Sequence, residues 1–206
     1  MPAADRAAGR RALLLDAGLQ LLGTQGLAGT TVRGLCAEAQ LNARYFYESF
    51  PDLDSLVVAV FDRVVADLRE AVDAAVAAAG PDPVARIRAT VASTAEFVDS
   101  DRRRARVLYV EGRGHERLQR RRAESSSLIA GLVAAEAAGR EPGAAHRIVA
   151  AFLVGGFSEL LTRWLDGDIP VDRDQLVHAA TELFLALGRA GGRLADAAAA
   201  AAPTRR

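Results

Sequence analysis

The chain has no lysine, one cysteine and few aromatic residues, and each shortage narrows its class. A single cysteine in 206 residues excludes an internal disulfide framework. Aromatic residues make up 5% of a sequence that is 50% hydrophobic, so the core must consist mainly of Leu, Val and Ala. That composition favours helices over sheets.

Net charge is also lacking, because 26 basic residues, all arginine, are balanced by 26 acidic residues. A protein with no net charge does not hold nucleic acid by bulk charge. Any DNA contact must therefore depend on where individual arginines are placed.

Long apolar segments and targeting signals are missing too. No apolar run approaches the ~20 residues that a membrane-spanning helix needs. The N-terminus, MPAADRAAGRR, has no apolar core of a signal peptide. We therefore expect a cytoplasmic protein without a membrane segment.

Catalytic and metal-binding patterns are absent from the sequence. His115, His146 and His178 are widely separated and form no local metal-ligand pattern. No Gly-rich phosphate loop, nucleophile elbow or His-Glu metal motif is present. We expect no enzyme activity, no metal and no cofactor. Cys36 lies on the apolar face of a short helix and is interpreted as a small core residue rather than a redox sensor.

The most informative stretch is 30–50, TTVRGLCAEAQLNARYFYESF. Its spacing predicts two short helices joined by a tight turn. Thr30 or Thr31 can cap the first helix, and Asn42 can cap the second. Phe46 and Phe50 are four residues apart, so they share a face and can hold the second helix to a core.

The rest of the second helix surface carries Arg44, Tyr45, Tyr47 and Glu48. Two helices joined by a short turn, with Arg and Tyr on the second, have the shape of a helix-turn-helix that enters the DNA major groove. The corner of an ordinary helical bundle has the same shape, and spacing alone does not separate the two.

Side-chain chemistry suggests which residues touch DNA. Arg44 can pair with guanine O6 and N7, contact a phosphate, or remain solvated. Tyr45 can reach the DNA or form part of the core. The predicted DNA-contacting residues are Thr31, Arg33, Asn42, Ala43, Arg44, Tyr45 and Tyr47.

A wider set of residues carries a family resemblance. It comprises Leu14, Ala17, Gly26, Thr31, Val32, Leu35, Ala39, Leu41, Asn42, Tyr47, Phe50 and Leu56. With these, residues 10–60 resemble the N-terminal DNA-binding region of the tetracycline-repressor (TetR) family of bacterial transcriptional regulators. The resemblance implies a phosphate contact for Tyr47. The chain departs from the family at Arg44, where a small residue is usual, and at Leu53, where a phosphate-binding lysine is usual.

The remaining chain predicts more helices and no strand. Residues 1–8 read as a loose tail, and a first helix follows over 9–25. A long helix is expected from Asp52 to about Ala79, before the break at 80–83, Gly-Pro-Asp-Pro. Five further helices are predicted at 82–98, 101–112, 115–138, 142–167 and 172–189.

The fold class is therefore all-α, in two domains. Residues 1–51 form a three-helix helix-turn-helix DNA-binding domain. Residues 52–190 form a helical ligand-binding and dimerisation domain, with 52–79 as the connecting helix. Residues 191–206 are Ala-rich and are expected to be disordered.

The C-terminal half also resembles the TetR family, at Trp164-Leu-Asp-Gly-Asp-Ile-Pro and in the segments 175–177 and 183–188. The resemblance implies that helices 142–167 and 172–189 pair with their copies as a four-helix bundle. Surplus apolar positions on both helices agree with an interface. Gly155-Gly156 would allow close approach.

An arginine-rich run, residues 102–122, has nine arginines and two glutamates. Its positive charge can serve an anionic ligand or an acidic partner surface. It can equally be a solvated face balanced by Asp99, Asp101, Glu111 and Glu116.

These observations predict a ligand-responsive, DNA-binding transcriptional regulator, a repressor that acts as a homodimer on a palindromic operator. The resemblance implies that an unidentified small molecule binds in the larger helical domain and shifts the long helix. Large side chains on central helices are the candidate pocket residues: Phe97, Tyr109, Phe152, Phe157 and Trp164. The alternative is a helical adaptor that uses the Arg44–Tyr47 face to bind protein.

Overall fold

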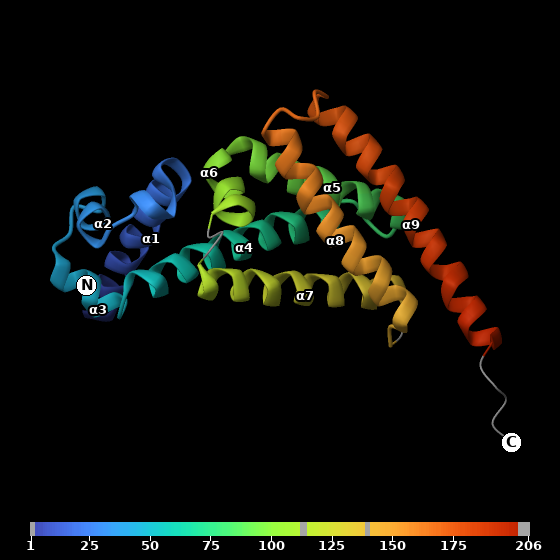
Figure 1. Ribbon diagram of the computed structural model, residues 1–206, viewed down its shortest axis with the longest axis horizontal. Helices are drawn as coiled ribbons and strands as arrows, with labels where there is room; N and C mark the ends of the chain where they lie inside the picture. The colour runs from blue at the N-terminus through green and yellow to red at the C-terminus, as the bar shows by residue number, and fades with distance from the viewer. Residues whose placement is uncertain (1–2, 112–114, 139–140, 202–206) are drawn as a thin grey trace, which may run out of the picture. The chain divides into compact units, whose positions relative to one another are not determined.

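The structure, a computed structural model, describes residues 3–111, 115–138 and 141–201, and every regular element in these ranges is helical (Figure 1). The expected all-α class is confirmed. The helices are α1 (Ala3–Gly29), α2 (Val32–Glu38), α3 (Ala43–Ser49), α4 (Leu53–Ala78), α5 (Pro83–Ser100), α6 (Arg102–Ala105), the π-helix η1 (Arg106–Val110), α7 (Glu116–Ala138), α8 (Ala144–Leu165) and α9 (Arg173–Ala201).

Two helices extend beyond the predicted ends. α1 already begins at Ala3, where the sequence predicts a loose tail. α9 continues to Ala201, so the predicted disordered tail is wrong for residues 191–201, while 202–206 lie outside the described residues. Alanine has the highest helix propensity, which favours continuation. Gly191 lies inside α9, at a point where the helix packs closely on α8. A Cβ on it would lie 3.1 Å from Val149 Cγ2.

The predicted single helix over 101–112 is also wrong. α6 ends at Ala105, and the five-residue π-helix η1 takes its place. Asp101 caps α6, because its carboxylate accepts the Arg103 N–H at 3.0 Å.

The described chain divides into two compact units. The first, here called the head unit, comprises Met1–Ala71 and Glu96–Arg122; the second comprises Val72–Ala95 and Ala123–Arg206. The domain boundary predicted between residues 51 and 52 lies inside the head unit. Residues distant in sequence, from α6, η1 and the start of α7, therefore belong to the same compact body as the helix-turn-helix.

Glycines on α1 explain how closely the head unit packs. A Cβ on Gly18 would lie 2.6 Å from Val60 Cγ2 of α4, and a Cβ on Gly23 would lie 2.7 Å from the Arg103 Cα of α6. Both distances are below van der Waals contact. The buried side chains around these contacts are mainly aliphatic, including Leu14, Leu22, Leu35, Leu56, Val57, Val60, Val64 and Leu118.

The arginine-rich run is tied to acids and carbonyls of the head unit. Arg117 reaches Asp52 at 3.3 Å, and Arg121 reaches Asp62 at 2.6 Å, so the start of α7 is bonded to α4. Further pairs are Arg102 with Asp99, Arg103 and Arg104 with Asp101, Arg106 with Glu111 and Arg120 with Glu116. Arg113 lies outside the described residues. Of the two interpretations of this run, the balanced surface agrees with the structure, with Asp52 and Asp62 as additional acids.

Asp101 shows the electrostatic effect of this pairing. The hydrogen bonds from Arg103, first from its side chain and then from its backbone, hold the pKa of the Asp101 carboxyl below its usual value, against partial burial. The same pair raises the pKa of Arg103. Arg103 also donates to Gln20 Oε1 at 2.6 Å, so it connects α6 to α1.

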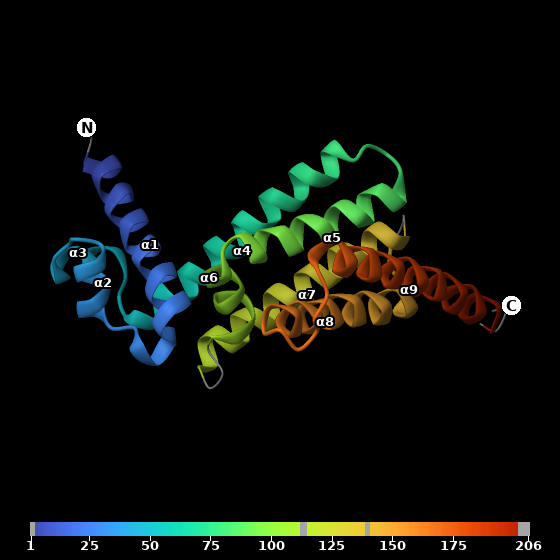
Figure 2. The same cartoon turned by 90° about the horizontal axis from the view of Figure 1, so that it is seen from above.

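The second unit contains α8 and α9, which run side by side in both views (Figures 1 and 2). Leu153, Leu161, Leu176 and Val177 are buried, yet large apolar side chains remain exposed on both helices. Among the described residues, α8 alone is long and apolar enough to cross a membrane by length and composition. Only 17% of its most apolar window is buried, so most of this apolar surface is at least partly exposed.

The contact at Gly23 makes a testable prediction. Gly23→Ala should lower the free energy of unfolding by about 1–3 kcal/mol, because the new methyl group meets the α6 backbone. Gly9→Ala is the matched control: it is a helical glycine of α1 with no atom within 4 Å of its Cβ. It should raise stability by about 0.5–1 kcal/mol. Urea unfolding measures both, and equal effects would contradict the close packing of α1 on α6.

Candidate nucleic-acid interface

The first short helix, α2, has a defined cap and a defined end. The Thr31 hydroxyl accepts the Gly34 N–H at 3.0 Å, which confirms Thr31 as the cap. At the C-terminal end, Gln40 adopts a left-handed φ of 54°. The Leu41 N–H donates to the Cys36 carbonyl at 2.9 Å, and the Gln40 N–H donates to Ala37 at 3.2 Å. These two bonds form a Schellman turn, with glutamine in the place that glycine usually takes.

The second short helix, α3, starts where the sequence predicts. The Asn42 side chain accepts the Tyr45 N–H at 3.2 Å and caps it. Phe46 is fully buried and Phe50 almost so. Their ring centroids lie 5.9 Å apart, so both phenylalanines hold one side of α3 in the core of the head unit. The predicted anchoring is confirmed.

The opposite side of α3 faces solvent. The Arg44 side chain is 83% exposed, and Tyr47 is 60% exposed. The Tyr47 ring packs edge-on against Phe46, with centroids 5.2 Å apart and planes at 87°. Its position is therefore fixed by the core while most of the residue remains accessible. A short polar helix held in this way presents an arginine and a phenol in a defined direction.

Glu48 and Arg10, which are far apart in the sequence, complete this surface. Glu48 accepts a hydrogen bond from Arg44 Nε at 2.9 Å and also faces Arg10 of α1 at 3.6 Å. The Arg10 guanidinium lies 4.4 Å from the centre of the half-buried Tyr45 ring. Tyr45 thus contributes partly to packing, which was one of its two predicted roles. Only tertiary contact brings Arg10 to α3, so no local pattern reveals it.

The other predicted contact residues lie on or beside the same two helices. Thr31, Arg33, Asn42 and Ala43 are all exposed. Thr31 and Asn42 already use their side chains as caps. A second α1 arginine, Arg11, lies over the Phe50 ring at 4.8 Å, so it supports the core side of α3.

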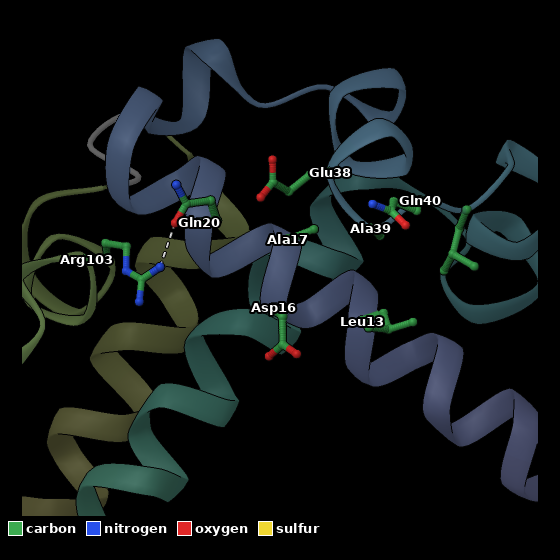
Figure 3. A pocket seen from close by; sticks show the side chains of 9 residues that line it. Leu13, Asp16, Ala17, Gln20, Glu38, Ala39, Gln40 and Arg103 are labelled. Atoms are coloured by element: carbon green, nitrogen blue, oxygen red, sulfur yellow. Dashed lines mark hydrogen bonds between the residues drawn. The ribbon is translucent and has the colours of Figure 1, made fainter.

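A cavity of about 490 Å³ adjoins the turn between α2 and α3 (Figure 3). It is lined by Leu13, Asp16, Ala17, Gln20, Glu38, Ala39, Gln40, Leu41 and Arg103. The hydrogen bond between Gln20 and Arg103 borders it. None of the five predicted pocket residues lines this cavity.

Those five aromatic residues divide between the two units. In the head unit, buried Phe97 stacks on the Arg104 guanidinium at 4.4 Å, and burial of the Tyr109 phenol raises its pKa. In the second unit, Phe157 packs edge-on against Phe184 at 5.4 Å, and Trp164 Nε1 donates to the Val171 carbonyl at 2.9 Å. Phe152 is 67% exposed, which does not suit a pocket wall.

Neither redox nor metal chemistry is supported by the side chains of the described residues. Cys36 is buried, and this burial raises the pKa of its thiol, which makes it less reactive. Within residues 3–111, 115–138 and 141–201, no group of three or more His, Cys, Asp or Glu side chains is arranged to hold a metal ion.

Comparison with known proteins identifies the helix-turn-helix region. Residues 14–60 match the model for bacterial regulatory proteins of the tetR family. The HTH-type transcriptional regulator BetI of Paraburkholderia xenovorans is 37% identical over 84 residues, which are 41% of this chain and 43% of that protein. BetI of Burkholderia mallei is 38% identical over the same length. The match thus spans less than half the length of these curated relatives.

Solved structures with the same fold cover most of the chain. The regulator FadR from Bacillus subtilis, in complex with stearoyl-CoA, has a TM-score of 0.70 at 15% identity and covers 84% of this chain and 96% of its own. The multidrug binding protein EbrR, complexed with imidazole, has a TM-score of 0.65 at 24% identity and covers 84% and 94%. At these identities the likeness shows a shared fold.

The sequence match covers α2, α3 and the flanking parts of α1 and α4, where the capped, phenylalanine-anchored helix lies. Through this region the chain is similar to the TetR family of bacterial regulatory proteins.

Proposed function

We propose that the protein is a ligand-responsive transcriptional repressor that binds a palindromic operator as a homodimer, with α3 as its recognition helix. The observation that carries the proposal is the two-sided character of α3. Phe46 and Phe50 hold one side in the core, while Arg44 and Tyr47 project from the other. A rigidly held helix with an exposed arginine suits insertion into the major groove, where guanidinium recognises guanine.

The proposal also assigns a role to each part of the chain. Residues 1–51 supply the DNA contacts, which are made by Thr31, Arg33, Asn42, Ala43, Arg44, Tyr45 and Tyr47. Tyr47 and the α2 residues contact phosphates and set the register, and Arg44 reads a base. Residues 52–190 supply effector binding and dimerisation, with α4 as the connection.

Exposed apolar surface on α8 and α9 supports the dimer. Ile148 and Phe152 are both about two-thirds exposed on α8, and Leu183 is 55% exposed on α9. Gly155 and Gly156 continue the α8 face with nothing within 4 Å of their Cβ positions. Such a face is costly in water unless a partner covers it. A second copy would cover it symmetrically and pair two recognition helices with two half-sites.

Effector binding belongs to the same proposal. Two solved proteins of this fold hold small molecules, stearoyl-CoA in one and imidazole in the other. For this chain, Phe157 and Trp164 remain candidate pocket residues within the second unit, and Phe97 and Tyr109 within the head unit, whereas the exposure of Phe152 favours the dimer face. The effector must bind one of two states better than the other, because only that difference changes operator affinity.

A cytoplasmic location and a lack of enzyme activity complete the proposal. In this proposal the apolar composition of α8 serves the interface between copies.

The DNA contacts can be tested with duplexes selected from a random library by the purified protein. Arg44→Ala should weaken binding to the selected sequence by about 1–3 kcal/mol and relax selection at one base pair. With Tyr47→Phe added, specific binding should be lost, and wild-type binding should weaken steeply with added salt. Arg120→Ala, at an exposed arginine of α7, is the matched control. Unchanged affinity in the folded double variant would favour the adaptor alternative.

Glu48 offers a second test, because its bond to Arg44 competes with the DNA. Glu48→Gln should increase affinity for the selected duplex several-fold, since it frees the guanidinium and removes a negative charge near phosphate. Stability should change by less than about 0.5 kcal/mol, because the pair is exposed. Fluorescence anisotropy measures the gain, and a loss of affinity would show instead that Glu48 orients Arg44 for binding.

The dimer face can be tested by introducing a charge. Phe152→Glu should weaken self-association by about 2 kcal/mol or more, because it places a carboxylate in an apolar interface. Val84→Glu, at another exposed apolar residue of the second unit, is the control. Sedimentation equilibrium gives the dimer dissociation constant. A wild-type monomer, or equal behaviour of the two variants, would contradict an interface at α8 and α9.

A further inference from the structure

Glu111 is a nearly buried carboxylate in the head unit that the proposed DNA contacts and effector pocket do not use. Its Oε2 accepts the backbone N–H of Leu27 at 2.8 Å. Its Oε1 accepts a hydrogen bond from Arg106 Nε at 2.6 Å. One side chain therefore joins the residue after the π-helix to the end of α1, across 84 positions of sequence.

The carboxylate is held from its own side by the unusual backbone of η1. The Glu111 N–H donates to the Arg106 carbonyl at 2.8 Å, five residues back, which is the π-helical pattern. Arg122 of α7 donates to the Glu111 carbonyl at 2.6 Å and to the Val107 carbonyl at 3.1 Å. Short π-helical turns are uncommon overall, and those that occur often lie at functional sites. Here the turn fixes the direction of one acid.

The α1 side of the contact is equally specific. Gly26 interrupts α1 with a φ of 74°, a left-handed conformation that favours glycine. A Cβ there would lie 3.1 Å from both Arg106 Nη2 and Glu111 Oε2, so any larger residue would also crowd these two side chains. The buried Thr30 hydroxyl donates to the Gly26 carbonyl at 2.8 Å, and α2 begins two residues later. Glu111 thus holds the turn from which the helix-turn-helix starts.

A carboxylate is energetically unfavourable at this nearly buried position unless it is hydrogen-bonded. Burying it costs free energy unless its oxygens are hydrogen-bonded, and an apolar side chain of similar size would avoid that cost. What the carboxylate provides is direction: it accepts the backbone N–H of the first residue after the break at Gly26. A role in fixing geometry explains the choice better than a role in stability alone.

We propose that Glu111, oriented by Arg106 and the π-helix η1, is a positioning residue for DNA recognition: it fixes the Gly26-Leu27 turn and, through it, the placement of α2 and α3. This inference rests on the proposed function. It assigns a determinant of operator selectivity to a residue outside the matched region 14–60, on a segment that belongs to the same compact unit.

Amide hydrogen exchange of the DNA-free protein tests the joint itself. Glu111→Gln keeps the size of the side chain but loses its charge, and it should speed exchange of the Leu27 amide by roughly tenfold or more. Exchange in the buried α4 segment around Val60 should remain within about twofold. Glu116→Gln removes an exposed acid that also pairs with an arginine, and it should change neither. If Glu111→Gln does not fold, Arg106→Gln removes the other hydrogen bond to the Glu111 carboxylate, at its more exposed partner, and should also speed exchange of the Leu27 amide.

DNA binding tests the consequence well below the unfolding temperature. Glu111→Gln should reduce affinity for the selected duplex by roughly tenfold, while affinity for unrelated duplex, which depends on phosphate contacts, stays within about twofold. A purely structural role would lower the melting temperature but leave the ratio of the two affinities unchanged, and that result would overturn the proposal. So would unchanged exchange at Leu27. A wild type that selects no duplex would instead refute the proposed function, and the exchange result would stand apart from it.

Discussion

The burial of Phe46 and Phe50 is the constraint on which the proposed interface depends. Seven residues of helix cannot hold a shape alone, because nucleating a helix costs more than so few hydrogen bonds return. Two aromatic rings in the core overcome that cost and also fix the rotation of α3 about its axis. Arg44 and Tyr47 then face outward as a geometric consequence. Arg44 and Tyr47 project from the surface because Phe46 and Phe50, four residues apart, are buried in the core.

The role of each arginine in this protein depends on where it lies and on its acid partner. The chain has no net charge. Most of the described arginines of the 102–122 run are bonded to acids, so their charge is neutralised within the head unit. Arg44 is more exposed than the arginines of these ion pairs, at 83%, and it lies on α3 with an accessible acid partner, Glu48. Exposed ion pairs exchange partners at little cost. The segment with the most arginines in the sequence therefore uses most of them in ion pairs within the head unit.

Local signals gave reliable predictions, and tertiary ones did not. Thr31, Asn42 and the Phe46–Phe50 spacing were readable because caps and helix faces depend on neighbours within four residues. The left-handed Gln40 was not, because glutamine carries no turn signal. The π-helix and the contact of Glu111 with Leu27 depend on segments far apart in sequence. The end of α9 was missed because glycines at 191–192 resemble a stop, while packing against α8 and the alanines beyond continue the helix.

The glycine contacts of α1 bear on how such a protein can be recombined. α4 and α6 approach α1 too closely for a single methyl group at Gly18 or Gly23. The helix-turn-helix therefore cannot be separated from the rest of the head unit at the end of the matched sequence region. A chimera cut after residue 51 would leave behind the partners that surround α1. Engineers who transplant this DNA-binding specificity onto another sensor would need to carry the 96–122 segment along, or redesign the surface it covers.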